Sequence, residues 1–244
     1  MIQLLTHRSY QKELLDADDI PTADLFQNLK ELDRINTLLG GYNITFSALK
    51  KIVKPDTAYT LIDIGCGGGD TLKHIKRWQL RKKMNLKLIG IDLKPVCIEY
   101  ANRQNNGEND RQNEGEKIEL ICDDYRNMFL HVPHIDIIHA CLFCHHLTET
   151  QLIELIQFAT ERRITLVIND LERNPIAYYA IKILTGLFSK SYLVKNDAPL
   201  SVARGFKKKE WLDIIKKAGA KHFSVKNKWA FRHEIIVYGH GVND

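Results

Sequence analysis

The sequence LIDIGCGGGD, residues 61–70, predicts a β-strand that turns sharply into a helix. Its first four residues read as a buried strand, and four of the five residues from Gly65 to Gly69 are glycine. Glycine adopts backbone conformations that other residues avoid, so the chain can approach a ligand closely at such a turn. The helix that follows offers unpaired N–H groups at its amino terminus. The stretch therefore predicts a binding site for a nucleotide-like ligand, of which several kinds would fit.

Short β-branched runs alternate with helical stretches from residue 59 onward, which predicts a doubly wound, mostly parallel α/β sheet with helices on both faces. A helix at 208–218, closed by Gly219, comes before a final pair of antiparallel strands. The expected parallel strands are 60–64, 86–91, 118–122, 135–139 and 164–169, and the final pair is 222–225 and 231–238.

The first part of the chain lies outside this alternation. Leucine and isoleucine residues spaced three or four apart between Leu25 and Leu39 predict a helix that Gly40 ends. A second helix is expected at 46–53. We therefore expect an N-terminal helical extension or lid at 1–56.

The main domain is expected at 57–244. It contains an apolar, aromatic helix at 176–188, followed by a loop through Pro199, and together these form a helical insert at about 175–206. The stretch 102–116 is rich in polar residues and predicts a surface loop without chemistry of its own.

The composition argues against several classes of protein. The 244 residues suffice for one well-buried domain, and no apolar run is long enough to cross a bilayer. Without a charged-then-apolar leader, the expected location is cytoplasmic. The net charge of +5 is spread along the chain, which argues against a nucleic-acid partner. Five cysteines leave an odd one out, so we expect no disulfide framework. A monomer or a homodimer is expected.

Two carboxylates narrow the choice of ligand. A phosphate loop for a nucleoside triphosphate requires a lysine after the glycines, where this chain has Asp70. A dinucleotide would require glycine or alanine at that position, because a carboxylate there would repel the pyrophosphate. Asp63, just before the turn, suits a ligand with an ammonium or sulfonium group. NAD or FAD is therefore the weaker interpretation.

Further acids follow the second and third predicted strands. Asp92 is placed to accept both hydroxyls of a ribose, and the third strand ends in CDD at 122–124. With these acids in order, the chain resembles the class I S-adenosylmethionine-dependent methyltransferase superfamily. The sequence DIGCGGG at 63–69 matches its first motif, Asp92 its ribose acid and Asp123 its adenine contact.

The resemblance follows residues 59–169 motif by motif. It implies a Rossmann-like sheet of seven strands whose last strand is antiparallel. It also implies S-adenosylmethionine as cofactor, S-adenosylhomocysteine as product, and no metal ion. The residues expected to contact the cofactor are Asp63, Gly65, Cys66, Gly67, Asp92, Leu93, Asp123, Asp124 and Ala140.

The fourth predicted strand leads into CLFCHH at 141–146, and in related enzymes this strand end faces the transferred methyl group. We predict His146, with His145 as a substitute, as the base that takes a proton from the acceptor. Both histidines could instead cap the next helix or shape the pocket. Cys141 and Cys144 could form a redox dithiol or bind zinc with a histidine, although no second ligand pair has suitable spacing.

The helical insert supplies the remaining predicted contacts. Tyr178 and Tyr179 could cover an aromatic acceptor. The sequence SVARGF at 201–206 is similar to a segment near the acceptor pocket of bacterial methyltransferases that resemble the quinone-modifying group. Arg173 and Arg204 could then hold an acidic or phenolic group of the acceptor.

These features predict methylation of a small hydrophobic acceptor, aromatic in character and methylated on oxygen. The alternatives are an RNA or other nucleic-acid methyltransferase, a non-catalytic binding subunit that keeps the cofactor fold, and an oxidoreductase. RNA binding would favour the first alternative, and NAD binding the last. Tight binding of adenosylhomocysteine would argue against a protein that keeps the fold but no longer binds the cofactor.

Overall fold

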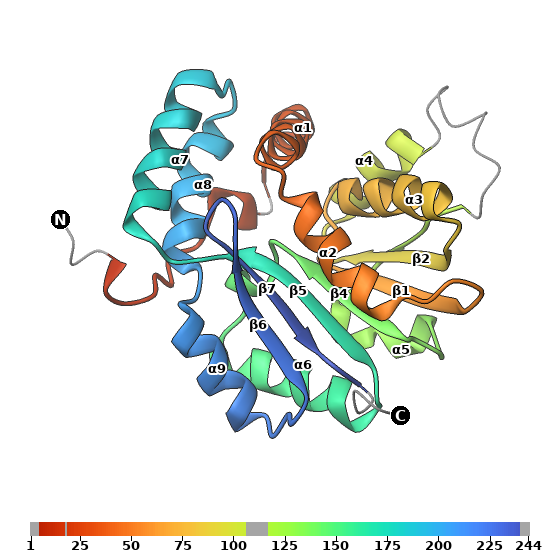
Figure 1. The fold of residues 1–244 in the computed structure, drawn as a ribbon. Helices are drawn as coiled ribbons and strands as arrows, with labels where there is room; N and C mark the ends of the chain where they lie inside the picture. The colour runs from red at the N-terminus through yellow and green to blue at the C-terminus, as the bar shows by residue number, and fades with distance from the viewer. Residues whose placement is uncertain (1–4, 18, 106–116, 240–244) are drawn as a thin grey trace.

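A seven-stranded sheet forms the centre of the computed structural model, which describes residues 5–17, 19–105 and 117–239 (Figure 1). The strands are ordered β3-β2-β1-β4-β5-β7-β6, and β7 runs in the direction opposite to the other six strands. The predicted Rossmann-like fold with an antiparallel last strand is confirmed. The strands are β1 (Ala58–Ile64), β2 (Asn85–Asp92), β3 (Glu119–Cys122), β4 (Ile137–Cys141), β5 (Thr165–Leu171), β6 (Phe223–Lys228) and β7 (Arg232–Val237).

Helices cover both faces of the sheet because the parallel strands are apolar on both sides. In β1, Leu61 packs toward α2, α3 and α4, whereas Ile62 and Ile64 pack toward α6 and α9. All three side chains are fully buried. The covering helices are α2 (Tyr42–Ile52), α3 (Asp70–Lys82), α4 (Pro95–Asn105), α5 (Met128–His131), α6 (Glu149–Glu161) and α9 (Lys208–Lys217).

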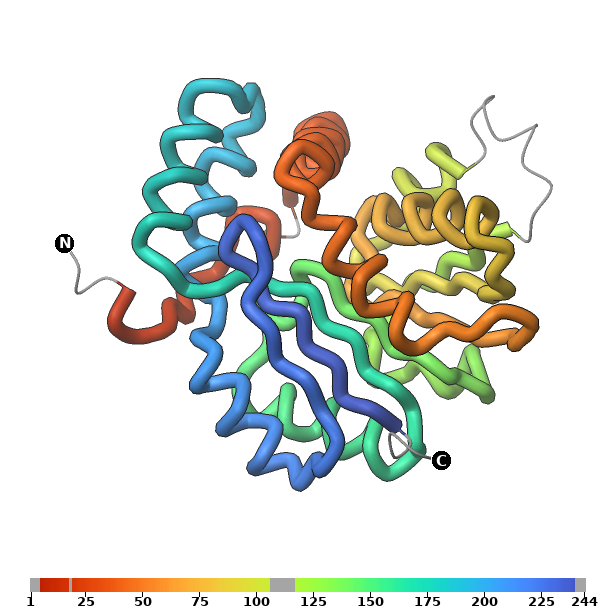
Figure 2. The backbone as a smooth tube through the Cα atoms, viewed as in Figure 1, coloured from red at the N-terminus to blue at the C-terminus, as the bar shows by residue number. Residues whose placement is uncertain are grey.

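Four further helices gather beyond the carboxyl ends of the parallel strands. They are η2 (Leu14–Asp16), α1 (Thr22–Leu38), α7 (Pro175–Phe188) and α8 (Tyr192–Arg204). Figure 2 shows the N-terminal segment beside α8, although the two are distant in the sequence. The carboxylate of Asp197 in α8 accepts hydrogen bonds from the amides of Leu14 at 2.8 Å and Leu15 at 2.9 Å. These bonds hold the N-terminal segment on the helical insert.

Several predicted boundaries differ from the structure. The second N-terminal helix begins at Tyr42, earlier than the predicted start at residue 46. β4 spans Ile137–Cys141, two residues later than predicted, because apolar residues also precede the strand and blur its start. Residues 102–105 belong to α4, so this part of the predicted surface loop is wrong. The rest of that loop, 106–116, lies outside the described residues.

The predicted loop through Pro199 is also wrong, because α8 continues unbroken through this residue. Proline inside a helix removes a hydrogen bond and costs about 3 kcal/mol. α8 offsets this cost by burying Leu193, Val194 and Val202, each worth about 1.5–3 kcal/mol when fully buried. Tertiary packing therefore decides the structure of this segment.

Candidate active site

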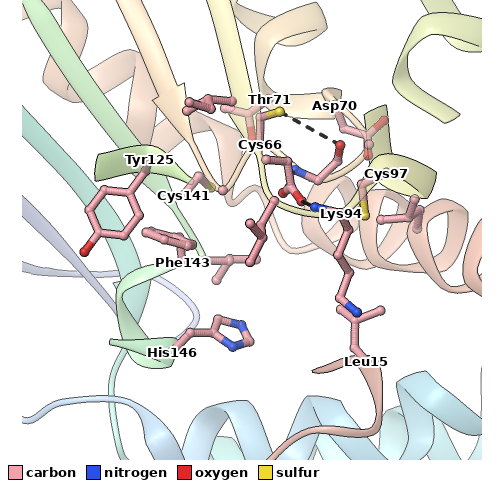
Figure 3. Close-up of a pocket in the computed structure, with 18 of the residues that line it drawn as sticks. Leu15, Cys66, Asp70, Thr71, Lys94, Cys97, Tyr125, Cys141, Phe143 and His146 are labelled. Atoms are coloured by element: carbon pink, nitrogen blue, oxygen red, sulfur yellow. Dashed lines mark hydrogen bonds between the residues drawn. The ribbon is translucent and has the colours of Figure 1, made fainter. Parts of the chain in front are cut away.

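A cavity of about 410 Å³ opens at the carboxyl ends of β1, β2 and β4 (Figure 3). The chain leaves β1 on one side to form β2 and β3 and then returns to form β4 on the other side, so the strand order reverses here. Ligands of open α/β sheets bind in the crevice at such a switch point. η2, α1 and the loops after β1, β2, β3 and β4 line the cavity.

The glycine turn after β1 forms one wall of the cavity. Gly65, Gly67 and Gly69 have φ angles of +63°, +51° and +71°, a region that residues with a Cβ rarely adopt. A Cβ on Gly65 would lie 2.1 Å from Cδ2 of Phe143, so this position also lacks space for a side chain. Gly65, Cys66 and Gly67 all line the cavity. The turn therefore brings backbone close to any bound ligand.

Asp92, at the end of β2, lines the cavity beside this turn. Its Oδ2 accepts a hydrogen bond from the amide of Gly67 at 2.8 Å, and its Oδ1 accepts one from the amide of Lys94 at 2.9 Å. Burial raises the pKa of the Asp92 carboxyl, and the two amides oppose this rise. Each oxygen retains a second lone pair, so the carboxylate can accept two further bonds from neighbouring hydroxyl groups.

The far end of the cavity contains Asp123 and Asp124, which follow β3, and the exposed side chain of Leu93. Asp123 accepts hydrogen bonds from His131 at 2.7 Å and Asn127 at 2.9 Å, which lower the pKa of its carboxyl to about 2. Asp124 caps the short helix η4 (Tyr125–Asn127) by accepting from a backbone amide. Both acids are therefore ionised at neutral pH.

The cavity as a whole is acidic. Six carboxylates line it, and Lys94 is the only lysine or arginine among the lining residues of the described chain. The amino group of Lys94 donates to the carbonyl of Ala17 at 2.8 Å, so it is engaged by the N-terminal segment. An excess of negative charge lowers the energy of a bound cation. The carboxylates are those of Asp16, Asp33, Asp70, Asp92, Asp123 and Asp124.

Asp63 and Ala140, both expected at the cofactor, do not line the cavity. Successive side chains of a strand point to opposite faces, so Asp63 lies on the α2 side of the sheet. There Asp63 Oδ1 is 2.6 Å from Nδ1 of His139, whose Nε2 is 3.0 Å from the hydroxyl of Thr45 in α2. Ala140 is buried in the core beneath α6 and α9. Both side chains are therefore directed away from the cavity.

The opposite wall is apolar apart from one histidine. Figure 3 shows Tyr125, Phe143 and His146 across the cavity from Lys94, Cys97 and Leu15. The rings of Tyr125 and Phe143 meet edge to face, with their centroids 5.5 Å apart. Burial raises the pKa of the Tyr125 phenol to about 12, so this ring stays neutral.

His145 and His146, in the short helix η5 (Cys144–His146), occupy different surroundings. His146 lines the cavity, and burial, together with the nearby His145 and two arginines, lowers the pKa of its imidazole well below the usual value. His145 is buried, and its Nδ1 lies 2.7 Å from Asp170. Burial alone would lower the pKa of His145, but Asp170 and Glu13 raise it. His146 is thus the histidine at the cavity, and His145 is the buried partner of Asp170.

Glu13 brings the two histidines together. Its carboxylate oxygens lie 3.7 Å from Nε2 of His145 and 3.8 Å from Nε2 of His146. One ligand atom from each of these three side chains lies close enough to the others to hold a metal ion. However, Arg204 Nη1 lies 3.6 Å from Glu13 Oε1 and 3.2 Å from Asp16 Oδ2, so a divalent cation would stand beside a fixed positive charge. We interpret the cluster of Glu13, His145 and His146 as one that positions His146, and not as a metal site.

The cysteine motif of the loop after β4 does not fit a redox or zinc site. Burial raises the pKa of the Cys141 thiol to about 12 and that of Cys144 still further above its usual value. Both are free thiols. Redox exchange and zinc binding both require a thiolate, which these surroundings disfavour.

Arg173, predicted to hold the acceptor, does not line the cavity. Its buried guanidinium donates to both carboxylate oxygens of Glu210 and to the carbonyls of Leu5 and Gly205. These four hydrogen bonds tie the N-terminal segment and α9 to the end of β5.

Arg204, Tyr178 and Tyr179 do not line the cavity either. Arg204 is buried and donates to Asp16 at 3.2 Å and to the carbonyl of Gln11 at 3.3 Å. The two tyrosines of α7 pack edge to face against each other, and Tyr179 points partly into solvent. The acceptor contacts predicted for these three residues therefore lie outside this cavity.

The site includes residues that the sequence analysis missed. Leu15 and Asp16 of η2 and Asn36 of α1 line the cavity, but their segments carry no recognisable motif. Tyr125 and Phe143 also line it. Phe143 stands two residues before His145 and could have been found from the predicted position of that loop.

Comparisons with known proteins agree with this geometry. Residues 61–162 match the family model described as "Methyltransferase domain". The plantazolicin methyltransferase BpumL, solved with S-adenosylhomocysteine, shares 17% identity over 91% of each chain, with a TM-score of 0.60. Human N-acetylserotonin methyltransferase, solved with S-adenosylmethionine, shares 16% identity over 89% of this chain and 56% of its own, with a TM-score of 0.58. A search of curated protein sequences returns no match.

The strand order, the glycine turn and the acid after β2 define the fold of the class I methyltransferases. The family match covers the segment that contains these motifs. Residues 61–162 therefore match a methyltransferase domain, and the chain has the fold of the class I, S-adenosylmethionine-dependent methyltransferases.

Proposed function

We propose that the acid-lined cavity holds S-adenosylmethionine through the residues of the glycine turn and the ends of β2 and β3. Asp92 would accept hydrogen bonds from the ribose hydroxyls, and Leu93 and Asp123 would lie at the adenine. Gly65 and Gly67 leave room for the ligand next to the backbone. The bound donor supplies a methyl group on a positively charged sulfur. The excess of carboxylates around the cavity is the observation that carries this assignment, because it suits the sulfonium and ammonium groups.

The proposed acceptor is a small hydrophobic molecule with an aromatic hydroxyl group, methylated on oxygen. The apolar wall of Tyr125, Phe143 and Leu147 supports a hydrophobic acceptor. The lowered pKa of His146 keeps its imidazole neutral at pH 7, and a neutral imidazole can take the phenolic proton as the oxygen attacks. Glu13 and Asp16, at 3.8 Å and 3.6 Å from the ring nitrogens, would then offset the charge that forms on His146.

A nucleic-acid acceptor is the weaker proposal. The phosphate backbone of a nucleic acid binds to clusters of lysine and arginine. Six carboxylates and one lysine line this cavity, so the backbone would be repelled at its mouth. A small uncharged or phenolic acceptor meets no such barrier.

Methyl transfer from isotope-labelled S-adenosylmethionine tests the proposal. The purified chain is offered two panels of matched size, one of phenols and one of aromatic amines, and the products are identified by mass spectrometry. We expect label on the oxygen of at least one hydrophobic phenol. Label on amines alone would contradict O-methylation. Bound adenosylhomocysteine without transfer to either panel or to a metabolite extract would favour a non-catalytic binding subunit.

A further inference from the structure

Helix α7 exposes an apolar stripe on its outer face. Ile176, Tyr179, Ile183 and Leu187 are spaced three or four residues apart and therefore lie on one side of the helix. Their exposed fractions are 67%, 42%, 62% and 72%, and Phe188 at the end of the helix is 77% exposed. A surface helix normally turns such a face to the core. An exposed apolar stripe of this length indicates an interaction surface for a protein, a membrane or another ligand.

The stripe is preformed on a fixed helical hairpin. α7 packs against α8 on its inner side and lies at the outside of the molecule (Figure 1). The turn between the two helices is held by Glu31 of α1, whose carboxylate accepts from the amides of Lys190 at 3.0 Å and Ser191 at 3.3 Å. The outer face of α7 therefore does not need to fold on binding.

Three lysines flank this stripe within its own stretch of the chain. Residues 175–196 contain Lys182, Lys190 and Lys195, all exposed, and no aspartate or glutamate. An apolar helix face with lysines at its edges binds a membrane surface, where the apolar residues enter the interface and the lysines meet anionic headgroups. We propose that α7 docks this enzyme on the surface of a lipid bilayer that contains anionic lipids.

The length of the helix separates docking from insertion. None of the helices in the described ranges has both the length and the apolar character needed to span a bilayer. α7 has 14 residues and is therefore about 21 Å long, shorter than the roughly 30 Å hydrocarbon core. The helix lies in the interface with its stripe facing the lipid.

A second copy of this chain is a poorer occupant. In a two-fold dimer the same patch meets itself, so the lysines of one copy would approach those of the other. The stretch 175–196 offers no carboxylate to pair with them. Charge complementarity therefore favours anionic lipid over self-association.

Co-sedimentation of the full-length chain with vesicles tests the proposal, and it does not depend on methyl transfer. One vesicle is pure phosphatidylcholine, and the other contains one-quarter phosphatidylglycerol. We expect binding to the anionic vesicle at least about tenfold tighter than to the neutral one. The variant Ile183→Ser/Leu187→Ser should lose at least about tenfold in affinity, because two apolar side chains no longer enter the interface.

Matched variants make the test specific. Leu130→Ser/Trp229→Ser removes two side chains that are 81% and 80% exposed but lie outside α7, and it should bind as the wild type does. Lys182→Glu/Lys190→Glu should abolish the preference for the anionic vesicle. Circular dichroism and adenosylhomocysteine binding check that each variant is folded.

Three results would overturn the proposal. The first is no sedimentation with either vesicle. The second is sedimentation that the stripe variant leaves unchanged or that shows no preference for anionic lipid. The third is a dimer in light scattering that Ile183→Ser/Leu187→Ser dissociates, which would assign the stripe to a second copy.

Discussion

The carboxylate of Asp92 accepts a hydrogen bond from the amide of Gly67 at 2.8 Å, which joins the end of β2 to the turn after β1. A second link lies beside it, where the amide of Cys66 donates to the carbonyl of Ile91 at 3.2 Å. Together they fix Asp92, the residue proposed to bind the ribose, next to the glycine turn before a ligand arrives. Preorganisation of this kind lowers the entropy cost of binding.

Gly65→Ala should destroy donor binding. The new Cβ would lie 2.1 Å from the Phe143 ring, on a backbone whose φ of +63° already disfavours alanine. We expect a lower melting temperature and at least about a hundredfold loss of adenosylhomocysteine affinity, from strain of about 1–3 kcal/mol and a displaced cavity wall. Gly186→Ala is the matched control, because nothing lies within 4 Å of its added Cβ. Wild-type affinity in Gly65→Ala would show that the turn does not touch the ligand.

His146→Gln should slow methyl transfer to a phenol without weakening donor binding. Loss of a general base typically costs about 10²–10⁴ in rate. His134→Gln is the control, since His134 is an exposed histidine that does not line the cavity. Single-turnover rates and adenosylhomocysteine calorimetry measure the two properties separately. An unchanged rate in His146→Gln would leave the residue with a role in shape alone.

The pH dependence of the wild-type rate follows from the lowered pKa of His146. A base works only in its neutral form, and His146 stays neutral below the pH at which an ordinary histidine, with a pKa of about 6.5, becomes charged. We therefore expect the rate with a phenol to be retained from pH 7 down to pH 6. A rate that halves near pH 6.5 or above, measured at saturating substrate, would contradict this assignment.

Asp170→Ala should strongly destabilise the fold. Removal of one partner from a buried charge pair costs about 3–5 kcal/mol, because His145 then keeps an uncompensated charge or loses its proton. Urea unfolding measures the loss. Lys217→Ala is the control, because it breaks the exposed pair between Lys217 and Glu149 and should leave the midpoint unchanged. Equal midpoints for both variants would show that the buried pair contributes nothing.

The contribution of this pair should also depend on pH. The pKa of His145 is raised, so its share of the stability is present below about pH 6.5 and is lost as the pH rises through the folded-state pKa. The pKa of Asp170 is lowered, so its share is present above about pH 4 and is lost as the pH falls through the folded-state pKa. The deficit of Asp170→Ala should therefore be largest between about pH 4 and 6.5. A loss of stability in Asp170→Ala that grows above pH 7 would contradict this predicted pH dependence.

The fold could be predicted because its determinants are local. Each parallel strand is a short apolar run, and the glycine turn stands directly after the first of them. Strand boundaries were less certain, as in β4, where apolar residues also precede the hydrogen-bonded segment. Pro199 shows the limit of local rules, since the burial of α8 against α7 and the N-terminal segment outweighs the cost of the proline.

The cofactor side of the site followed from sequence more readily than the acceptor side. Asp92 and the glycines sit at strand ends, where the topology fixes their direction. Asp63 sits one residue earlier on its strand than the last buried isoleucine, and the alternation of side chains turns it to His139. Long side chains such as Arg173 reach partners in distant segments of the chain. No spacing in the sequence predicts that Arg173 pairs with Glu210.

Calorimetry of the full chain with adenosylhomocysteine and with NAD, in wild type and Asp92→Ala, tests the central claim most directly. We predict that the wild type binds adenosylhomocysteine at one site and does not bind NAD. Asp92→Ala should lose at least about a hundredfold in affinity, since hydrogen bonds to a charged group are worth about 1.5–3 kcal/mol each. Asp213→Ala, on the exposed face of α9, should bind as the wild type does. Tighter binding of NAD, or unchanged adenosylhomocysteine affinity in Asp92→Ala, would contradict the assignment of this cavity to the methyl donor.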